Sequence, residues 1–100
     1  MNRKDLFACP FYFDKIELDP DKVNDAIKNT TCLHAMSVDE NILETNFKFL
    51  YDPIDKVVSK VMSELGFMKY SIFSSWITKT VIGYRHGLDH QHNNSFYSGI

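Results

Sequence analysis

The sequence has little cysteine, glycine or proline and no surplus of positive charge. It contains two cysteines, four glycines and three prolines in 100 residues. Two cysteines, Cys9 and Cys32, are too few for a disulfide-stapled secreted domain, so we expect both to be reduced thiols. Eleven Lys and Arg against 13 Asp and Glu give a net charge of −2. This composition gives no support for direct binding of nucleic acid.

Long apolar runs are also missing. No stretch approaches the roughly 18 consecutive apolar residues of a membrane-spanning helix. The apolar run 6–13 contains Pro10, ends at Asp14 and lacks a small-residue cleavage site, so it is not predicted to be a signal peptide. We therefore expect a cytoplasmic protein (the host cytoplasm if it is viral) with no membrane partner.

The composition that is present suits a folded chain. The sequence is 44% hydrophobic and 14% aromatic, which is enough apolar material for a core and argues against disorder. A length of 100 residues suits one domain or a piece of one.

The first half of the chain predicts one extended segment and one short helix. Residues 6–18 are rich in Phe, Tyr and Ile, which favours an extended segment or a strand, with Pro10 at an edge or a break. Asp19 is a good N-cap and Pro20 suits the first helical position, so a helix is predicted over about 20–29. Residues 30–51 show no clear period and are predicted to be loop.

A second helix has the clearest pattern. Asp52 is predicted to cap it, Pro53 to occupy its first position and Gly66 to end it in a left-handed conformation. Between them lies an apolar stripe on a 3.6-residue period, made of Ile54, Val57, Val58, Val61, Met62 and Leu65. We interpret the stripe as a packing face, with a partner-binding helix as the alternative.

From about Ser71 the pattern changes to strand. The segment is β-branched and aromatic, as strands prefer. Alternation places Ile72, Trp76, Thr78, Thr80 and Ile82 on one face and Phe73, Ile77 and Val81 on the other. Residues 95–100 predict another strand. Helices followed by strands indicate an α+β organisation.

Three of the four histidines, His86, His90 and His92, fall within seven residues. In a strand, alternate side chains point the same way, so His90 and His92 would project from one face about 6–7 Å apart. Imidazole binds divalent iron, copper, nickel and zinc well, so the pair is a candidate metal site. A solvated His-rich loop is the alternative, and His34, alone in a loop region, is expected not to be a ligand.

The surrounding residues resemble a known family. The sequence contains Trp76, then Gly83 and Gly87, the His90-x-His92 pair, and Ser95-Phe-Tyr-Ser-Gly-Ile100. This combination resembles a phage-type 2-oxoglutarate/Fe(II)-dependent oxygenase family. The likeness covers the last 25 residues well, the first 30 loosely, and the middle of the chain hardly at all.

The resemblance implies a fold, an activity and a set of cofactors. The fold would be a double-stranded β-helix, a jelly-roll or cupin-like barrel, with N-terminal helices packed on its first strands. The activity would be that of a dioxygenase, a hydroxylase-type oxidoreductase that uses Fe(II) and 2-oxoglutarate. His90 would be the first iron ligand. His92 would stand where the wider superfamily has a carboxylate, so it is either a second ligand or a residue beside the site.

The same resemblance predicts an incomplete barrel. Only 29 residues follow Ser71, and no position matches the distal histidine or the arginine that anchors 2-oxoglutarate. We expect residues 1–100 to form a single partial domain, with a helical and extended region at 1–70 and the first strands at 71–100. Such a fragment would be inactive alone and would self-associate through exposed sheet edges. The alternative is a non-catalytic cupin-like binding or structural module of a virus.

Overall fold

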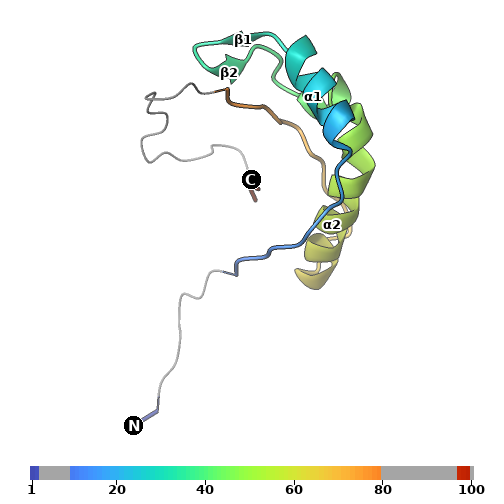
Figure 1. Cartoon of the computed structure of the whole chain (residues 1–100). Helices are drawn as coiled ribbons and strands as arrows, with labels where there is room; N and C mark the ends of the chain where they lie inside the picture. Colours follow the sequence, from blue (N-terminus) through green and yellow to red (C-terminus); the bar gives the residue numbers. More distant parts are fainter. Residues whose placement is uncertain (3–9, 80–96, 100) are drawn as a thin grey trace.

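The computed structural model describes residues 1–2, 10–79 and 97–99 of the chain, as two helices, a small hairpin and two 3₁₀ turns (Figure 1). The elements are, in order, α1 (Pro20–Asn29), β1 (Cys32–Leu33), β2 (Met36–Ser37), η1 (Ile42–Glu44), η2 (Lys48–Leu50) and α2 (Tyr51–Glu64).

Helix α1 confirms the prediction for residues 20–29. Asp19 is its N-cap, and the Asp19 carboxylate accepts hydrogen bonds from the backbone N–H groups of Asp21 (3.0 Å) and Lys22 (3.5 Å). Pro20 occupies the first helical position, where its missing N–H costs nothing. Ala26 is the buried residue of the helix, so its small side chain lets neighbouring segments pack close to α1.

The N-terminal segment is less regular than the sequence predicts. Residues 10–19 form no strand, although they include most of the predicted extended stretch. The segment comes close to α2 through an exposed ion pair between Asp14 and Lys60, whose N···O distance is 3.9 Å. A solvent-exposed pair of this kind contributes little to stability.

Part of the predicted loop 30–51 is a β-hairpin. Strands β1 and β2 pair antiparallel, with Cys32 opposite Ser37 and Leu33 opposite Met36. The two residues between the strands, His34 and Ala35, have φ angles of 51° and 68°. Positive φ at both central positions is the geometry of the tight hairpin turn that matches strand twist. Because neither residue is the Gly, Asn or Asp typical of such turns, the sequence did not reveal the hairpin.

The rest of that predicted loop supplies most of the core. Ile42, Leu43 and Phe47 are buried together with Ala26 of α1, and Phe47 is only 4% exposed. Around this cluster pack partly buried apolar residues: Ile27, Leu50, Tyr51, Ile54, Ile72 and Ile77. The core therefore joins α1, the two 3₁₀ turns, the start of α2 and the segment that follows α2.

Helix α2 confirms the second predicted helix but corrects its start. It begins at Tyr51, directly after η2, with Leu50 as an N-cap that makes no side-chain hydrogen bond. Asp52 is therefore in the first turn and does not cap the helix, because the chain is already helical before it. Of the apolar stripe, only Met62 is buried; the other five residues are half-buried.

The end of α2 is as predicted. Gly66 has a φ angle of 84°. The N–H of Gly66 donates to the Ser63 carbonyl (3.1 Å) and the N–H of Phe67 donates to the Met62 carbonyl (2.8 Å). These two hydrogen bonds define a Schellman motif, in which a left-handed residue closes the helix.

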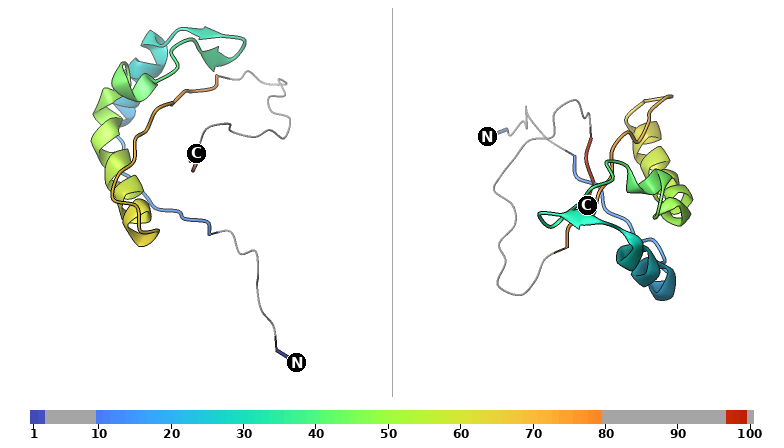
Figure 2. Two further views of the ribbon diagram at one scale, coloured as in Figure 1. Left: turned by 180° about the vertical axis from the view of Figure 1, so that it is seen from behind. Right: turned by 90° about the horizontal axis from the view of Figure 1, so that it is seen from above.

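The segment after α2 runs back along the helix toward the hairpin, as both side views show (Figures 1 and 2). It is not the regular strand predicted from Ser71. Only two isolated bridges form in residues 71–79, a parallel one between Asn41 and Ser75 and an antiparallel one between Met36 and Thr78. Pairing thus changes partner and direction within three residues.

The predicted faces of this segment are also wrong in part. Ile72 and Ile77 both pack against the core cluster, although strict alternation would put them on opposite faces. Trp76, predicted on the face of Ile72, is 41% exposed. The change of pairing partner between Ser75 and Thr78 interrupts the alternation, because it reorients the backbone between the two isoleucines.

These elements combine helices and strands, but the described residues do not test the predicted jelly roll. Residues 97–99, where a further strand was predicted, are exposed and form none, and the remainder of that stretch lies outside the description. Within the described ranges, neither helix is long and apolar enough to cross a bilayer.

Candidate functional site

The predicted metal ligands lie in a part of the chain that the structure does not describe. His90 and His92, and His86 with them, fall within residues 80–96. The fourth histidine, His34, is described: it is exposed in the turn between β1 and β2. The structure therefore describes the segment that leads to the histidines, residues 71–79, which we call the approach, and the surfaces around it.

Side-chain hydroxyls fix that approach to the core loop. The Ser75 hydroxyl donates to the Asn41 side-chain oxygen (2.6 Å) and accepts from the N–H of Leu43 (3.0 Å). The N–H of Ile77 donates to the Ser37 hydroxyl (3.1 Å). Because these hydrogen bonds join residues more than 30 positions apart, they hold the segment in place where a continuous strand ladder does not.

The loop that receives Ser75 is itself organised by Asp39. The Asp39 carboxylate accepts hydrogen bonds from the Thr45 hydroxyl and from the Asn41 N–H, the latter at 2.9 Å. The hydrogen bond from Thr45, and after it the one from Asn41, holds the pKa of Asp39 below its ordinary value of 3.8. A carboxylate kept ionised in this way suits a structural role in the turn, since a general base would need a raised pKa.

A second shifted group lies beside α2. The Tyr70 hydroxyl donates to the Asp55 carboxylate at 2.6 Å. This hydrogen bond is the main cause that raises the pKa of Tyr70 above its ordinary value of 10.0. A phenol with a raised pKa is a poor nucleophile at neutral pH. The hydrogen bond therefore attaches Tyr70 to α2 and does not indicate a catalytic role.

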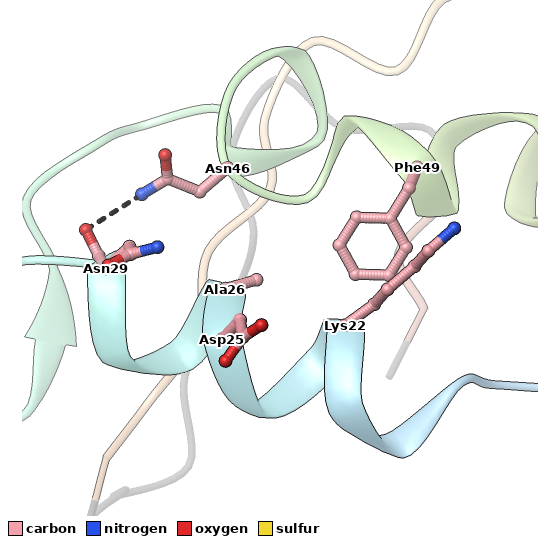
Figure 3. A pocket seen from close by; sticks show the side chains of 6 residues that line it. All are labelled: Lys22, Asp25, Ala26, Asn29, Asn46 and Phe49. Atoms are coloured by element: carbon pink, nitrogen blue, oxygen red, sulfur yellow. Dashed lines mark hydrogen bonds between the residues drawn. The ribbon is translucent and has the colours of Figure 1, made fainter.

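An open groove lies between α1 and the two 3₁₀ turns (Figure 3). Its volume is about 240 Å³, below the roughly 300–1,000 Å³ of typical ligand pockets. The Phe49 ring and the Asn46 side chain face α1, and the Asn46 amide donates to the Asn29 carbonyl at 3.1 Å. The groove is lined by Lys22, Asp25, Ala26, Asn29, Asn46 and Phe49. It fits, at most, a small fragment of a ligand.

No preformed metal centre is found in the part of the chain that the structure describes: no three His, Cys, Asp or Glu residues there lie close enough together to hold an ion. Cys32 is a half-buried free thiol. The sequence does not reveal the polar residues that organise the region, such as Asn41 and Ser75, because both residue types are common and their partners are far away in the chain.

Comparison with known proteins adds no relative: no protein-family model matches the sequence, and no curated protein or solved structure is significantly similar to it.

Proposed function

We propose that the chain carries the iron-binding start of a 2-oxoglutarate/Fe(II)-dependent oxygenase domain of the phage type, with His90 and His92 as metal ligands. The observation on which this depends is the His90-x-His92 pair in its sequence context, between Trp76 and the Ser95-Phe-Tyr-Ser-Gly-Ile100 stretch. In full-length relatives the domain would be a jelly roll.

The chemical type of the two predicted ligands suits iron. Neutral imidazole is a good ligand for Fe(II), and two imidazoles from an H-x-H pair can approach one ion from the same side of an extended chain. The pair supplies two protein ligands, whereas the facial triad of non-haem iron enzymes has three. His92 stands in place of the usual carboxylate, so both residues need testing separately.

When bound, Fe(II) would supply the redox chemistry that uses dioxygen as the oxidant, with one oxygen atom consumed in the oxidative decarboxylation of 2-oxoglutarate and the other in hydroxylation of a substrate. The residues of the chain would hold and orient the ion. We expect the 100 residues alone to bind metal weakly and to show no turnover, because no position in them matches a distal histidine or an arginine anchor.

The described residues support the proposal through the segment that leads toward the histidines. The chain that leads from α2 toward the histidines includes Ser75 and Thr78, which bridge to two other segments, and it packs Ile72 and Ile77 on the core. These contacts attach the segment that leads toward the histidines to the core loop and the hairpin, although the segment is not a regular strand.

Metal titration tests the proposal. We expect the full chain to bind Zn(II), used as a redox-silent substitute for Fe(II), with one site per chain by calorimetry. His90→Ala should weaken binding at least about tenfold, since loss of one of two ligands removes well over 1.4 kcal/mol of binding free energy. His92→Ala should do the same if His92 is a ligand and less if it only borders the site.

His34→Ala is the matched control, because His34 is an exposed histidine of the hairpin turn. Its affinity for Zn(II) should equal that of the unmodified chain. Equal, weak binding by all four proteins would refute the metal site and leave the non-catalytic cupin-like module as the better interpretation.

A further inference from the structure

The C-terminus of α1 is completed by residues from distant parts of the chain. The last carbonyl groups of a helix have no partner within it and need another donor. Thr30, only 5% exposed, provides two hydrogen bonds: its N–H to the Ile27 carbonyl (3.3 Å) and its hydroxyl to the Ala26 carbonyl (2.6 Å). Asn46 provides another from the η1–η2 loop, to the Asn29 carbonyl.

The side chain of Lys79 provides two more hydrogen bonds at this end of α1. Its ammonium nitrogen lies 2.5 Å from the Ile27 carbonyl oxygen and 3.0 Å from the Thr30 carbonyl oxygen. A positive charge at this end of a helix is favourable, because the helix dipole concentrates negative charge there. Hydrogen bonds from a charged donor are also about twice as strong as neutral ones. Lys79 is thus a C-terminal cap contributed by a residue about 50 positions away.

The backbone of the same residue is attached to the hairpin. The N–H of Lys79 donates to the Ala35 carbonyl (2.7 Å), and the N–H of Ser37 donates to the Ile77 carbonyl (2.9 Å). Lys79 therefore links two parts of the molecule, α1 by its side chain and the hairpin turn by its backbone, while the Ile77 carbonyl joins the same segment to β2.

We propose that Lys79 is a charge-dependent latch that holds residues 77–79 on α1 and the hairpin. Removing its charge releases this segment, while α1, α2 and the core loop stay folded. The latch is independent of the proposed function, because all of its contacts lie within described residues.

Ile77 offers a competing explanation, since it packs on the core and could hold the segment without the ammonium. Lys79→Met separates the two. Methionine keeps an unbranched, flexible stem and leaves Ile77 in place, so it removes the charge and the donors alone. Lys79→Arg keeps the charge and can donate to two acceptors.

Amide hydrogen exchange of the full chain, followed residue by residue by NMR, tests the latch. In Lys79→Met, the N–H groups of Ile77 and Lys79 should exchange about tenfold faster or more, as expected from the loss of hydrogen bonds to a charged group. Exchange of the Val58 and Val61 amides in α2 should stay unchanged. Lys79→Arg should keep the protection of the unmodified protein, as should Lys69→Met, which neutralises an exposed lysine.

Three results would overturn the proposal. Unchanged exchange at Ile77 and Lys79 in Lys79→Met would show that packing of Ile77 suffices. Faster exchange throughout α2, or a Lys79→Met protein that does not fold, would show that the residue supports the whole fold and is not a local latch. In either case Lys79→Arg reports whether charge matters: loss of protection in that variant would also count against the latch.

Discussion

At the scale of single residues, side-chain hydrogen bonds hold the backbone in place where regular secondary structure is missing. The turn at residues 39–45 has no strand or long helix to fix it. Instead, the Asp39 carboxylate binds Thr45 and Asn41, and Ser75 binds Asn41 and Leu43. Such local hydrogen bonds from Asp, Ser, Thr and Asn can replace backbone ladders. The loop that supplies Ile42 and Leu43 to the core is held in this way.

Thr45→Val should raise the pKa of Asp39 toward its ordinary value of 3.8, because the Thr45 hydroxyl is the main cause of its lowering. The Asn41 N–H remains, so the return should be partial. An NMR titration of the Asp39 carboxyl carbon measures the shift. Thr31→Val, a change at an exposed threonine, is the control and should leave the titration curve where it is.

The sign of the pH effect on stability follows from the direction of the shift. A lowered pKa in the folded state stabilises the protein above the unfolded pKa, and this stabilisation is lost as the pH falls through the folded pKa. The Asp39 contribution to the difference in unfolding free energy between the unmodified protein and Thr45→Val should therefore be present at neutral pH and disappear once Asp39 is protonated in both. A difference that grows on acidification would contradict this account.

At the scale of elements, both helices depend on their ends. Helix α1 has a side-chain N-cap at Asp19, and α2 has a Schellman motif at Gly66. The Gly66 position is informative because a Cβ added there would meet no atom within 4 Å. Any effect of substitution must come from the backbone angle and not from a clash.

Gly66→Ala should destabilise the protein by about 1 kcal/mol, because alanine pays a conformational penalty at a φ angle of 84°. Urea unfolding measures the free energy. Ser63→Ala lies in the same last turn of α2 at an exposed helical position and is expected to stay within about 0.5 kcal/mol. If Gly66→Ala proves as stable as Ser63→Ala, the left-handed end of α2 is not fixed by glycine.

The sequence predicts the helices far better than the rest, for a physical reason. The Asp19-Pro20 start and the Gly66 stop are local chemistry, so neighbouring residues reveal them. Ile42 and Phe47 lie in or next to 3₁₀ turns, which are too short to show a hydrophobic period. The hairpin turn uses His34 and Ala35, which are not residue types that indicate a positive φ angle.

The same limit applies to the candidate site. The spacing of His90 and His92 is visible in the sequence, so a metal site could be predicted from it, and that prediction still awaits a test. The approach to these residues could not be predicted. Its geometry depends on which distant groups Ser75 and Lys79 meet, and hydrogen bonds across 30 to 50 positions leave no pattern in a single sequence.

At the scale of the whole molecule, the described residues pair a small core with much exposed apolar surface. Among the described residues, five hydrophobic ones are buried: Ala26, Ile42, Leu43, Phe47 and Met62. By contrast, Phe11 and Phe13 are 83% and 88% exposed and lie together, with ring centroids 6.3 Å apart. Neighbouring exposed aromatic rings favour association.

We expect the full chain to self-associate, and the double substitution Phe11→Ser and Phe13→Ser to reduce that association. The serines remove apolar surface without disturbing any buried contact. Sedimentation velocity over a range of concentrations measures the effect. Glu17→Ser, a change at an exposed polar residue of the same segment, is the control. A monodisperse monomer that melts cooperatively at all concentrations would show the expectation to be wrong.

The distant cap on α1 has a consequence for the order in which the protein can be built. A nascent chain leaves the ribosome N-terminal end first, so α1 emerges long before the lysine that completes it, 52 positions beyond Ile27. An isolated helix shorter than about 12 residues is marginal in water, and α1 has 10. During synthesis we expect this helix to form and unfold repeatedly, and to become stable only when residue 79 has left the exit tunnel.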